Sequence, residues 1–498
     1  MICSVSAASL ATRPVGLLAV GVAEGAPGRG SPAARLEAAT RGALKALLAT
    51  GDFSGKTGET ALLYPGGVRA KRVLAIGLGP ASRVDDRALY LAAATAARRA
   101  RELGAGTLAV ALPASSDESW RAIGEGLVLG QHRHTAYLSN GSKAALKRAE
   151  LLAPRAPGAA ARAALADGVT RGEAVGLARE LANTPGQDLP PVALAERARE
   201  IAKRVRAKAT LYDVPAMERL GMGCVLAVGR GSPHPPRFIE LVREAGVAKR
   251  KSRVSTVVVI GKGVTFDTGG VPLKPREGMS KMKYDMSGAA AVLGMFASLD
   301  TLELPFRLVG LIPSAENATG GRAVKPGYVV RAMDGTTIEV TNTDAEGRLL
   351  LADALVYARR WKPDAVVDLA TLTGAISIAL GRQAAGLFTR DETLASELHR
   401  AGEETGERLW RMPLWSDFLA EMRSDTADLV NSNERREGAS CTAAAFLSHF
   451  ASTLPWAHLD IDSTAWNYGD RPDCSRGPNA FGVRLLVRWL EGRAKAAR

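Results

Sequence analysis

The chain has 498 residues, more than one ordinary domain holds, so we expect two domains. Its 46% hydrophobic and 23% charged residues are typical of a globular protein, and no apolar run is long enough to cross a membrane. The net charge of +14 keeps nucleic acid open as a partner, but only 5% of the residues are aromatic, which argues against a stacking platform for single strands.

The four cysteines lie far apart in the sequence and form no CxxC pair. We therefore expect reduced thiols in a cytoplasmic protein, and no zinc site built from thiolates. The first residues, MICSVSAASLATRPVG, lack a charged region ahead of a clean apolar stretch, so we expect no signal peptide.

The first part of the chain alternates between short β-rich runs and Ala/Leu-rich helical stretches. Residues 72–79 (RVLAIGLG) and 107–113 (TLAVALP) predict buried strands, and residues 89–104 predict a helix that stops at a glycine. Residues 152–168 are rich in Ala, Pro and Gly and mark the best candidate boundary, with a helix expected after Pro157. We predict an N-terminal domain over residues 1–165 and a C-terminal domain over residues 166–498.

The alternation of short β-rich runs and helical stretches continues in the second part of the chain. Four runs predict buried strands that end in polar residues or glycines, at residues 255–263, 306–317, 364–375 and 456–466. Helical segments separate them, which is typical of a mostly parallel sheet with helices on both faces. The predicted fold class is therefore α/β, with two domains that each contain a mostly parallel sheet flanked by helices. In such sheets, ligands bind beyond the carboxyl ends of the strands.

Three segments place charged residues at predicted strand ends. They are GKGVTFDTGGVPLK with Lys262, Asp267 and Lys274, MKYDMSGAAAV with Lys283 and Asp285, and NTDAEGRL with Asp344, Glu346 and Arg348. If these ends converge, four carboxylates share one cleft, and like charges at close range stay ionised only when cations neutralise them. Two divalent metal ions, about 3.5–4 Å apart and bridged by carboxylates, would supply that charge. The ligands on offer are oxygens and a lysine amine, which suit Mn²⁺ or Mg²⁺ as well as Zn²⁺.

Each segment also has a simpler interpretation. GKGVTFDTGG is a glycine-rich turn after a strand, and it lacks the GxxxxGK[ST] pattern of a phosphate loop. In NTDAEGRL, an extended backbone would point both carboxylates and Arg348 to one side, where such groups commonly form a surface pair of little energetic value. A two-metal phosphoesterase is a further alternative, disfavoured because none of the six histidines lies in these segments. The pattern alone predicts a metal-dependent α/β enzyme.

Several blocks of the sequence resemble one protein family. NTDAEGRL resembles the signature of the leucyl (cytosol) aminopeptidase family, whose members are metallo-exopeptidases with two metal ions. GKGVTFDTGG…LKP…MKYDMSGAAAV is similar to the family's other metal-site block in order and spacing. ANTPGQDLPP, DLATLTGA and WAHLDI resemble further blocks of its catalytic domain, and GDFSGKTGE…KRVLAIGLG resembles the N-terminal domain of bacterial, aminopeptidase A-like members. The resemblance covers most of the chain.

The resemblance implies a metal-binding role for five residues. Asp267 and Glu346 would bridge both metal ions, Lys262 and Asp285 would complete one of them, and Asp344 would complete the other. A lysine ligates a metal only as the neutral amine, and a dication at bonding distance drives that deprotonation.

The resemblance also implies roles for residues that bind no metal. Lys274 and Arg348 would be the catalytic cations. The substrate would contact Thr371, Leu372 and Gly374, with Met282 in the pocket for its side chain.

The implied reaction is the release of N-terminal amino acids, leucine among them, from peptides by a metal-activated hydroxide. Two metal ions lower the pKa of a bridging water toward neutrality, and one would bind the substrate's α-amine. Lys274, as an ammonium, would stabilise the oxyanion. Because all four carboxylates would hold metal, the family uses bicarbonate as the base, and Arg348 would anchor that ion.

The resemblance further implies a cytoplasmic homohexamer with Mn²⁺ or Zn²⁺ as its cofactor. Some bacterial relatives also bind DNA, and the basic excess before residue 170 fits either DNA binding or plain solubility. The N-terminal domain is therefore predicted to be regulatory or to support oligomerisation.

The sequence departs from the family pattern in several places, two of them near the expected site. Thr268 replaces the usual Ser but keeps the hydroxyl, so we expect little effect. Asp462-Ser463 replaces Ala-Gly after WAHLDI. This change predicts either a preference for polar or basic N-terminal residues or a solvated loop side chain at Asp462.

Overall fold

The computed structural model describes residues 1–139, 146–246, 254–433 and 435–497. The chain divides into two compact units. The first contains Met1–Gly176 and Gly469–Arg476, and the second contains Leu177–Tyr468 and Gly477–Arg498. The point of division between Gly176 and Leu177 lies inside one long helix, α5 (Ala159–Asn183).

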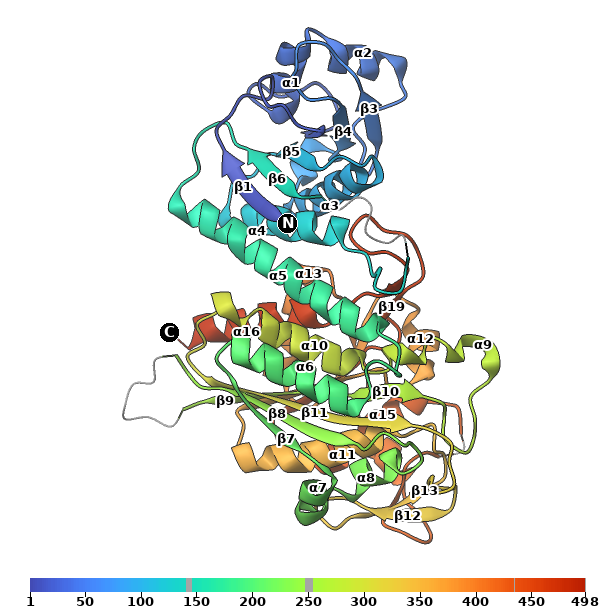
Figure 1. Ribbon diagram of the computed structural model, residues 1–498. Coiled ribbons are helices and arrows are strands. Elements are labelled where there is room, and N and C mark those ends of the chain that lie inside the picture. The colour runs from blue at the N-terminus through green and yellow to red at the C-terminus, as the bar shows by residue number, and fades with distance from the viewer. Residues whose placement is uncertain (140–145, 247–253, 434, 498) are drawn as a thin grey trace. The chain divides into compact units, whose positions relative to one another are not determined.

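The first unit contains a six-stranded sheet in the order β1-β6-β5-β2-β4-β3 (Figure 1). Its strands are β1 (Ile2–Ser6), β2 (Leu17–Val22), β3 (Thr60–Leu63), β4 (Val73–Gly77), β5 (Thr107–Ala111) and β6 (Arg148–Leu152). Every pairing in this sheet is parallel except that of β3 with β4. Alternate residues of β2 enter different cores, Leu17 and Ala19 on one face and Leu18 and Val20 on the other, because successive side chains of a strand point in opposite directions. This sheet is therefore buried on both faces.

The described helices of the first unit that precede α5 are α1 (Pro32–Thr40), α2 (Ala43–Thr50), the short η1 (Ala81–Arg83), α3 (Asp86–Glu102) and α4 (Asp117–Gln131). Three of them, α1, α3 and α4, begin at side-chain caps. Asp85 caps α3 and Ser116 caps α4, each by accepting a hydrogen bond from a backbone N–H of the first turn. Helices α3 and α4 pack closely because α4 presents glycines to α3. A Cβ at Gly126 would lie 2.3 Å from the Tyr90 carbonyl oxygen.

The second unit is built on a nine-stranded sheet in the order β16-β15-β18-β14-β9-β11-β8-β7, with β10 paired to β11. Its strands are β7 (Lys208–Tyr212), β8 (Arg237–Arg243), β9 (Thr256–Gly261), β10 (Gly263–Asp267), β11 (Arg307–Asn317), β14 (Ala365–Ala370), β15 (Ala385–Thr389), β16 (Leu409–Arg411) and β18 (Trp456–Asp460). The central strands β18, β14, β9 and β11 are parallel, whereas β8 runs antiparallel to β11, β7 to β8, and β15 to β18. The carboxyl ends of the four central strands therefore meet at one edge.

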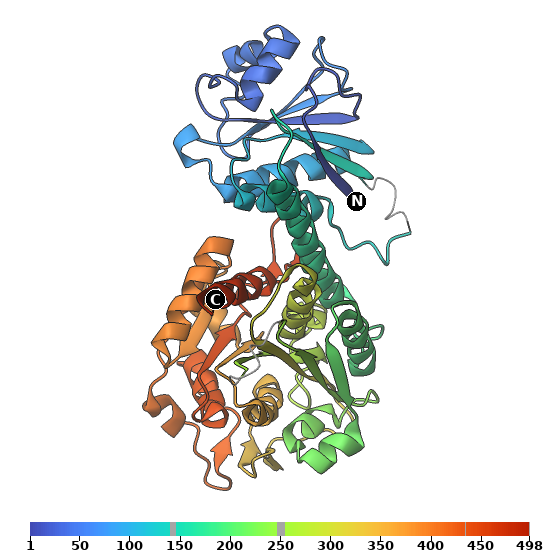
Figure 2. The same ribbon diagram turned by 90° about the vertical axis from the view of Figure 1, so that its left-hand side faces the viewer.

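Helices cover both faces of this sheet (Figures 1 and 2). On one face lie α6 (Pro191–Arg204), α10 (Ser287–Ala297) and α16 (Val483–Ala496), and on the other lie α8 (Gly223–Gly229), α11 (Gly347–Ala358) and α15 (Ala439–Ala451). The remaining helices are α7 (Val214–Leu220), α9 (Arg276–Met279), η2 (Met282–Tyr284), η3 (Leu299–Thr301), η4 (Arg359–Trp361), α12 (Gly374–Leu380), α13 (Glu392–Thr405) and α14 (Ser416–Ala420). Two small sheets join β12 (Tyr328–Arg331), β13 (Thr337–Val340) and β17 (Leu429–Val430), and β19 (Trp466–Asn467) with β20 (Gly477–Pro478).

The predicted α/β fold class is confirmed. The runs at 255–263, 306–317, 364–375 and 456–466 contain β9, β11, β14 and β18, and all four strands are almost wholly buried. The antiparallel outer strands were not predicted, because strand direction depends on where the chain returns to the sheet rather than on local periodicity. Among the described residues, no helix is both long and apolar enough to cross a membrane.

Candidate active site

The carboxyl edge of the large sheet brings the three charged segments together. Lys262 lies between β9 and β10, and Asp267 is the last residue of β10. Asp285 directly follows η2, and Glu346 directly precedes α11. These groups converge because β9, β11 and β14 are parallel neighbours, so the loops that follow them start from the same edge.

Asp267 is held by groups on two neighbouring segments. Its Oδ1 accepts hydrogen bonds from the backbone N–H of Gly269 at 2.9 Å and from Nδ2 of Asn317 at 2.8 Å. The turn that follows places Gly269 and Gly270 at φ 87° and 75°, a region that favours glycine. The Thr268 hydroxyl donates to the Asn317 carbonyl and accepts from the N–H of Gly270, so the hydroxyl kept at this position takes part in the turn.

Lys262 is the buried centre of the site. Its Nζ lies 2.8 Å from Asp285 Oδ1 and 2.9 Å from Glu346 Oε1, and it donates to the Thr371 carbonyl oxygen at 2.8 Å. Burial alone would lower the pKa of this amine, but the surrounding carboxylates outweigh that effect and raise the pKa well above its ordinary value. The carboxylates around Lys262 therefore favour its ammonium form.

Lys274 joins the other two carboxylates. Its Nζ lies 2.7 Å from Asp267 Oδ2 and 2.5 Å from Asp344 Oδ1. Burial opposes the charge here too, and the neighbouring carboxylates, Asp267 first, again raise the pKa above its ordinary value. Lys274 is less buried than Lys262, with 20% of its side chain exposed against 4%.

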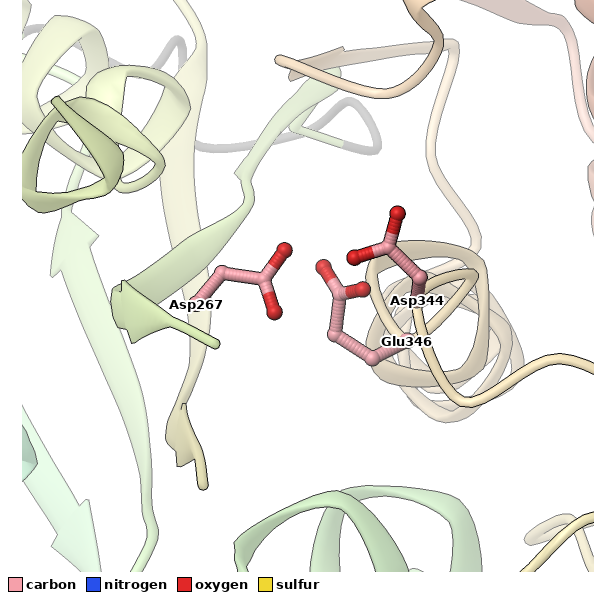
Figure 3. A group of neighbouring side chains, drawn as sticks. All are labelled: Asp267, Asp344 and Glu346. Atoms are coloured by element: carbon pink, nitrogen blue, oxygen red, sulfur yellow. The ribbon is translucent and has the colours of Figure 1, made fainter. Parts of the chain in front are cut away.

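The acidic side chains face one another across the strand end and the start of α11 (Figure 3). One carboxylate oxygen from each of Asp267, Asp344 and Glu346 lies within 4.8 Å of the other two. Burial raises the pKa values of Asp285, Asp344 and Glu346, and the neighbouring carboxylates raise them further, although the lysines act in the opposite direction. The carboxyl groups of this cluster therefore resist full ionisation unless further positive charge lies beside them.

This arrangement fits divalent metal ions. The carboxylates outnumber the lysine ammonium groups two to one. Asp285 Oδ2 and Glu346 Oε2 are buried and accept no hydrogen bond from any residue that the structure describes. A buried carboxylate oxygen without a partner is costly, and a bound cation removes that cost. The donor set is oxygen-rich with one amine, which matches hard or borderline dications.

Arg348 lies in the first turn of α11 and is also buried. Its Nη1 donates to the Asn431 carbonyl oxygen at 2.7 Å, and its Nε is buried without a hydrogen-bond partner among the described residues. Burial lowers the pKa of the guanidinium to about 10, which still leaves it charged near neutral pH. Arg348 therefore keeps a donor that is available to an anion.

The segment NTDAEGRL differs from the extended surface turn that its spacing suggested. Glu346 is the N-cap residue of α11, with φ −76° and ψ −33°, and Gly347 is the first residue of the helix. Gly347 has no positive φ, so its role is not to bend the chain. A Cβ at Gly347 would lie 2.9 Å from Lys262 Nζ, so the glycine makes room for the lysine amine.

The residues expected to contact substrate occupy two of the converging segments. Thr371 follows β14 and donates its hydroxyl to Asp285 Oδ1 at 2.6 Å. The Leu372 N–H donates to Asp460 Oδ1 at 3.2 Å, and Gly374 is the exposed first residue of α12. Met282 is half-buried in η2, three residues before Asp285. The structure thus brings the Thr371 segment directly against Asp285, and it places Met282 on the same short helix turn that leads to Asp285.

Asp462 lies between these two segments. Its Oδ1 accepts from the Tyr284 hydroxyl at 2.7 Å, and its Oδ2 accepts from the Ser377 hydroxyl at 3.1 Å. Tyr284 ends η2, and Ser377 lies in α12. Asp462 is therefore a link between two elements of the site, rather than a solvated loop side chain.

Two asparagines that matter to the site were not singled out from the sequence. Asn317 Nδ2 donates to Asp267 and to the Thr343 carbonyl oxygen at 3.0 Å, and Asn431 Nδ2 donates to the Asn342 and Ala345 carbonyl oxygens. Asn317 ends a predicted strand, so its position at a strand end was a usable signal. Asn431 lies far along the chain, next to the short strand β17, and carries no local signal.

Comparison with known proteins gives two family matches that together span most of the chain. Residues 176–487 match the catalytic domain of the cytosol aminopeptidase family, and residues 19–141 match the N-terminal domain of the same family. The chain belongs to the cytosol aminopeptidase family. The family predicted from the sequence is thus confirmed, and the protein is a peptidase, a metal-dependent aminopeptidase by family.

Individual relatives of the family cover nearly the whole chain. A probable cytosol aminopeptidase of Roseiflexus castenholzii is 46% identical over 89% of this chain and 92% of its own length. One from Geobacter sulfurreducens is 41% identical over 99% of both chains. Among solved structures, the bottromycin maturation enzyme BotP in complex with Mn has a TM-score of 0.85 and 37% identity, covering 96% of this chain and 100% of its own. A tomato leucine aminopeptidase mutant has a TM-score of 0.87 and 33% identity, covering 98% of this chain and 96% of its own.

Proposed function

We propose that this protein is a two-metal aminopeptidase that releases N-terminal amino acids, leucine among them, from peptides. The observation that carries the proposal is the largely buried cluster of Asp267, Asp285, Asp344 and Glu346, in which two lysine ammonium groups pair with four carboxylates among the residues that the structure describes. Two divalent ions would supply the missing positive charge. Manganese is favoured by the relative solved in complex with Mn, and zinc suits the same donors.

Five residues would hold the ions: Lys262, Asp267, Asp285, Asp344 and Glu346. Lys262 would have to lose its proton to bind metal, so metal uptake would release a proton and weaken as pH falls. When bound, the ions would lower the pKa of a water molecule and so supply a hydroxide at neutral pH.

The other site residues would act on the substrate directly. Lys274 would remain an ammonium and donate to the developing oxyanion. Arg348 would hold an anionic base such as bicarbonate, for which its unpartnered Nε is a ready donor. Thr371, Leu372 and Gly374 would line the path of the substrate, and Met282 would contact its N-terminal side chain.

The remaining proposals concern the whole chain. Residues 166–498 would form the catalytic domain, and residues 1–165 would form a basic domain with a regulatory or oligomerisation role. A cytoplasmic homohexamer is expected from the family resemblance. DNA binding stays a prediction from the basic excess, and a gel-shift titration at increasing salt would test it.

The test of the proposed function is hydrolysis of a leucine anilide by protein stripped of metal with a chelator, then supplied with Mn²⁺, Zn²⁺ or Mg²⁺. We expect no turnover without metal and restored turnover with at least one ion. Turnover by the stripped protein, or none with any ion, would refute the proposal. Lys274→Ala should reduce turnover steeply while leaving metal bound, and the matched variant Lys203→Ala, at an exposed position of α6, should leave both unchanged.

A further inference from the structure

Two cations gather on one aromatic ring beside the proposed substrate path. The Lys281 Nζ lies 4.8 Å from the centroid of the Tyr468 ring, and the Arg382 Cζ lies 3.5 Å from the same centroid. Lys281 also lies 5.8 Å from the Trp466 ring. The two positive groups therefore share the neighbourhood of one half-exposed tyrosine, which is 42% exposed. We call Lys281, Arg382 and Tyr468 the cationic rim.

The positive charge of the cationic rim is not balanced within the described part of the chain. Lys281 and Arg382 form no ion pair and no side-chain hydrogen bond there, and aromatic rings are their only described partners. Cation–π contact stabilises each group singly, but two like charges on one ring repel each other. A bound anion between them would turn that repulsion into attraction.

The rim is joined to the metal site by two layers of contacts. In the inner layer, Thr371 donates to Asp285. In the next layer, Tyr284 and Ser377 both donate to Asp462. Lys281 precedes η2, which carries Met282 and leads to Asp285, and Arg382 follows α12, which begins just after Thr371. The Tyr284 ring packs edge-on against Trp466 with centroids 5.5 Å apart, and Lys281 of the rim lies over the same Trp466 ring. The second layer is thereby joined to the rim. The same two segments therefore run from the proposed metal ligands out to the two cations.

Helix α12 gives a scale for the separation between Thr371 and Arg382, which lie just before and just after it in the chain. Its seven residues span about 10 Å, at about 1.5 Å per residue. An extended peptide of three residues covers about 10 Å. A peptide whose N-terminus lies at the acidic cluster would thus present its third or fourth residue near the rim. A free peptide carboxylate at that distance is the anion that fits two unpaired cations.

We propose that the cationic rim binds a carboxylate of short peptide substrates, so that this enzyme favours tripeptides and tetrapeptides with a free C-terminal carboxylate over neutral ones. The proposal rests on the proposed aminopeptidase function. An acidic side chain near the third residue offers the same chemistry as a free C-terminus. Binding of the carboxylate strengthens substrate affinity and needs no change in the reaction itself.

The test compares kcat/KM for Leu-Gly-Gly as the free acid and as the C-terminal amide, using the full-length protein with Mn²⁺. We expect the acid to be favoured roughly three- to twenty-fold, the range for two partly exposed ion pairs, and the ratio to fall as salt rises. In the double variant Lys281→Gln/Arg382→Gln the ratio should fall toward one. The matched control is Arg360→Gln, which removes a cation 4.6 Å from the Tyr357 ring centroid and should keep the wild-type ratio.

Two further substrates distinguish a C-terminal carboxylate from a side-chain carboxylate, and the rim proposal from the aminopeptidase proposal. Leu-Gly-Glu amide carries only a side-chain carboxylate. If its kcat/KM equals that of the free acid, the rim binds acidic side chains. If its kcat/KM equals that of the neutral amide, the rim binds the C-terminal carboxylate. An acid-to-amide ratio near one for both carboxylate sources, or a ratio that the double variant keeps, overturns the rim proposal. Leucine anilide carries no carboxylate, so its hydrolysis by the wild type shows separately whether the aminopeptidase proposal holds.

Discussion

The substitution Gly347→Ala tests the close approach of α11 to Lys262 in the proposed site. A Cβ at this position would lie 2.7 Å from Lys262 Cε, 2.9 Å from its Cδ and 2.9 Å from its Nζ. Non-bonded carbon atoms settle at about 3.5–4.0 Å, so the lysine side chain has to move by roughly 1 Å. Its Nζ is held by oxygens of Asp285, Glu346 and Thr371 at 2.8 to 2.9 Å, so that movement breaks at least one of these contacts.

The expected effect on function is much larger than the effect on folding. Losing one hydrogen bond to a charged group costs about 1.5–3 kcal/mol, whereas alanine is favoured over glycine in a helix by up to about 1 kcal/mol. The free energy of unfolding should therefore fall by only about 1–2 kcal/mol. A displacement of about 1 Å in a reacting site reduces the rate by about a hundred-fold. We expect kcat/KM for leucine anilide to fall by about that factor, together with weaker metal binding.

The assay combines kcat/KM at saturating Mn²⁺, a metal titration and urea unfolding. Gly492→Ala is the matched control, because that glycine lies in α16 and its Cβ would meet Arg400 Nη2 at an ordinary 3.7 Å. Wild-type kcat/KM and wild-type metal affinity in Gly347→Ala would refute the reasoning, since they would show that the lysine amine does not need its present position.

Three further predictions follow from the same contacts. Arg348→Ala should lower kcat about a hundred-fold or more while metal content stays at the wild-type level, whereas Glu346→Ala should abolish turnover and empty the site, as metal analysis of the purified variants will show. Burial raises the pKa of Asp353, in α11, to about 7 from an ordinary 3.8. A raised carboxyl pKa means that stability is lost as pH rises through the folded-state value. Urea unfolding should therefore show the wild type losing up to about 3 kcal/mol between pH 5 and pH 8 relative to Asp353→Asn. Asp462→Ala removes the acceptor shared by two hydroxyls, and a panel of aminoacyl anilides should show raised KM values and an altered preference among N-terminal residues.

For each of these three predictions, one experimental result would contradict the reasoning. Loss of metal in Arg348→Ala would make that residue structural rather than catalytic. Parallel pH profiles for the wild type and Asp353→Asn would mean that Asp353 ionises normally in the folded state. Asp462→Asn keeps one acceptor and should lie between the wild type and Asp462→Ala, and an unchanged preference in both variants would end the role of Asp462 in selectivity.

The periodic features of the sequence were enough to predict much of the second unit. Strand β9 reads as an apolar run that ends in Gly261, and α10 reads as a helix of small residues directly after Asp285. Polar residues at the ends of parallel strands converge by the geometry of the sheet alone. The pattern therefore indicated a common site if these ends converge, and the family resemblance gave Asp267 and Glu346 their expected roles in it.

The sequence by itself determined which residue types reach the carboxyl edge of the sheet, because burial pattern and strand ends are local properties. Only the tertiary structure decided which of those residues touch. The need for glycine at position 347 comes from Lys262, which is distant in the chain. The support of Arg348 by Asn431 and the two partners of Asp462 likewise join residues more than 80 positions apart. Such pairings depend on how loops pack after the sheet has formed, and no local pattern encodes them.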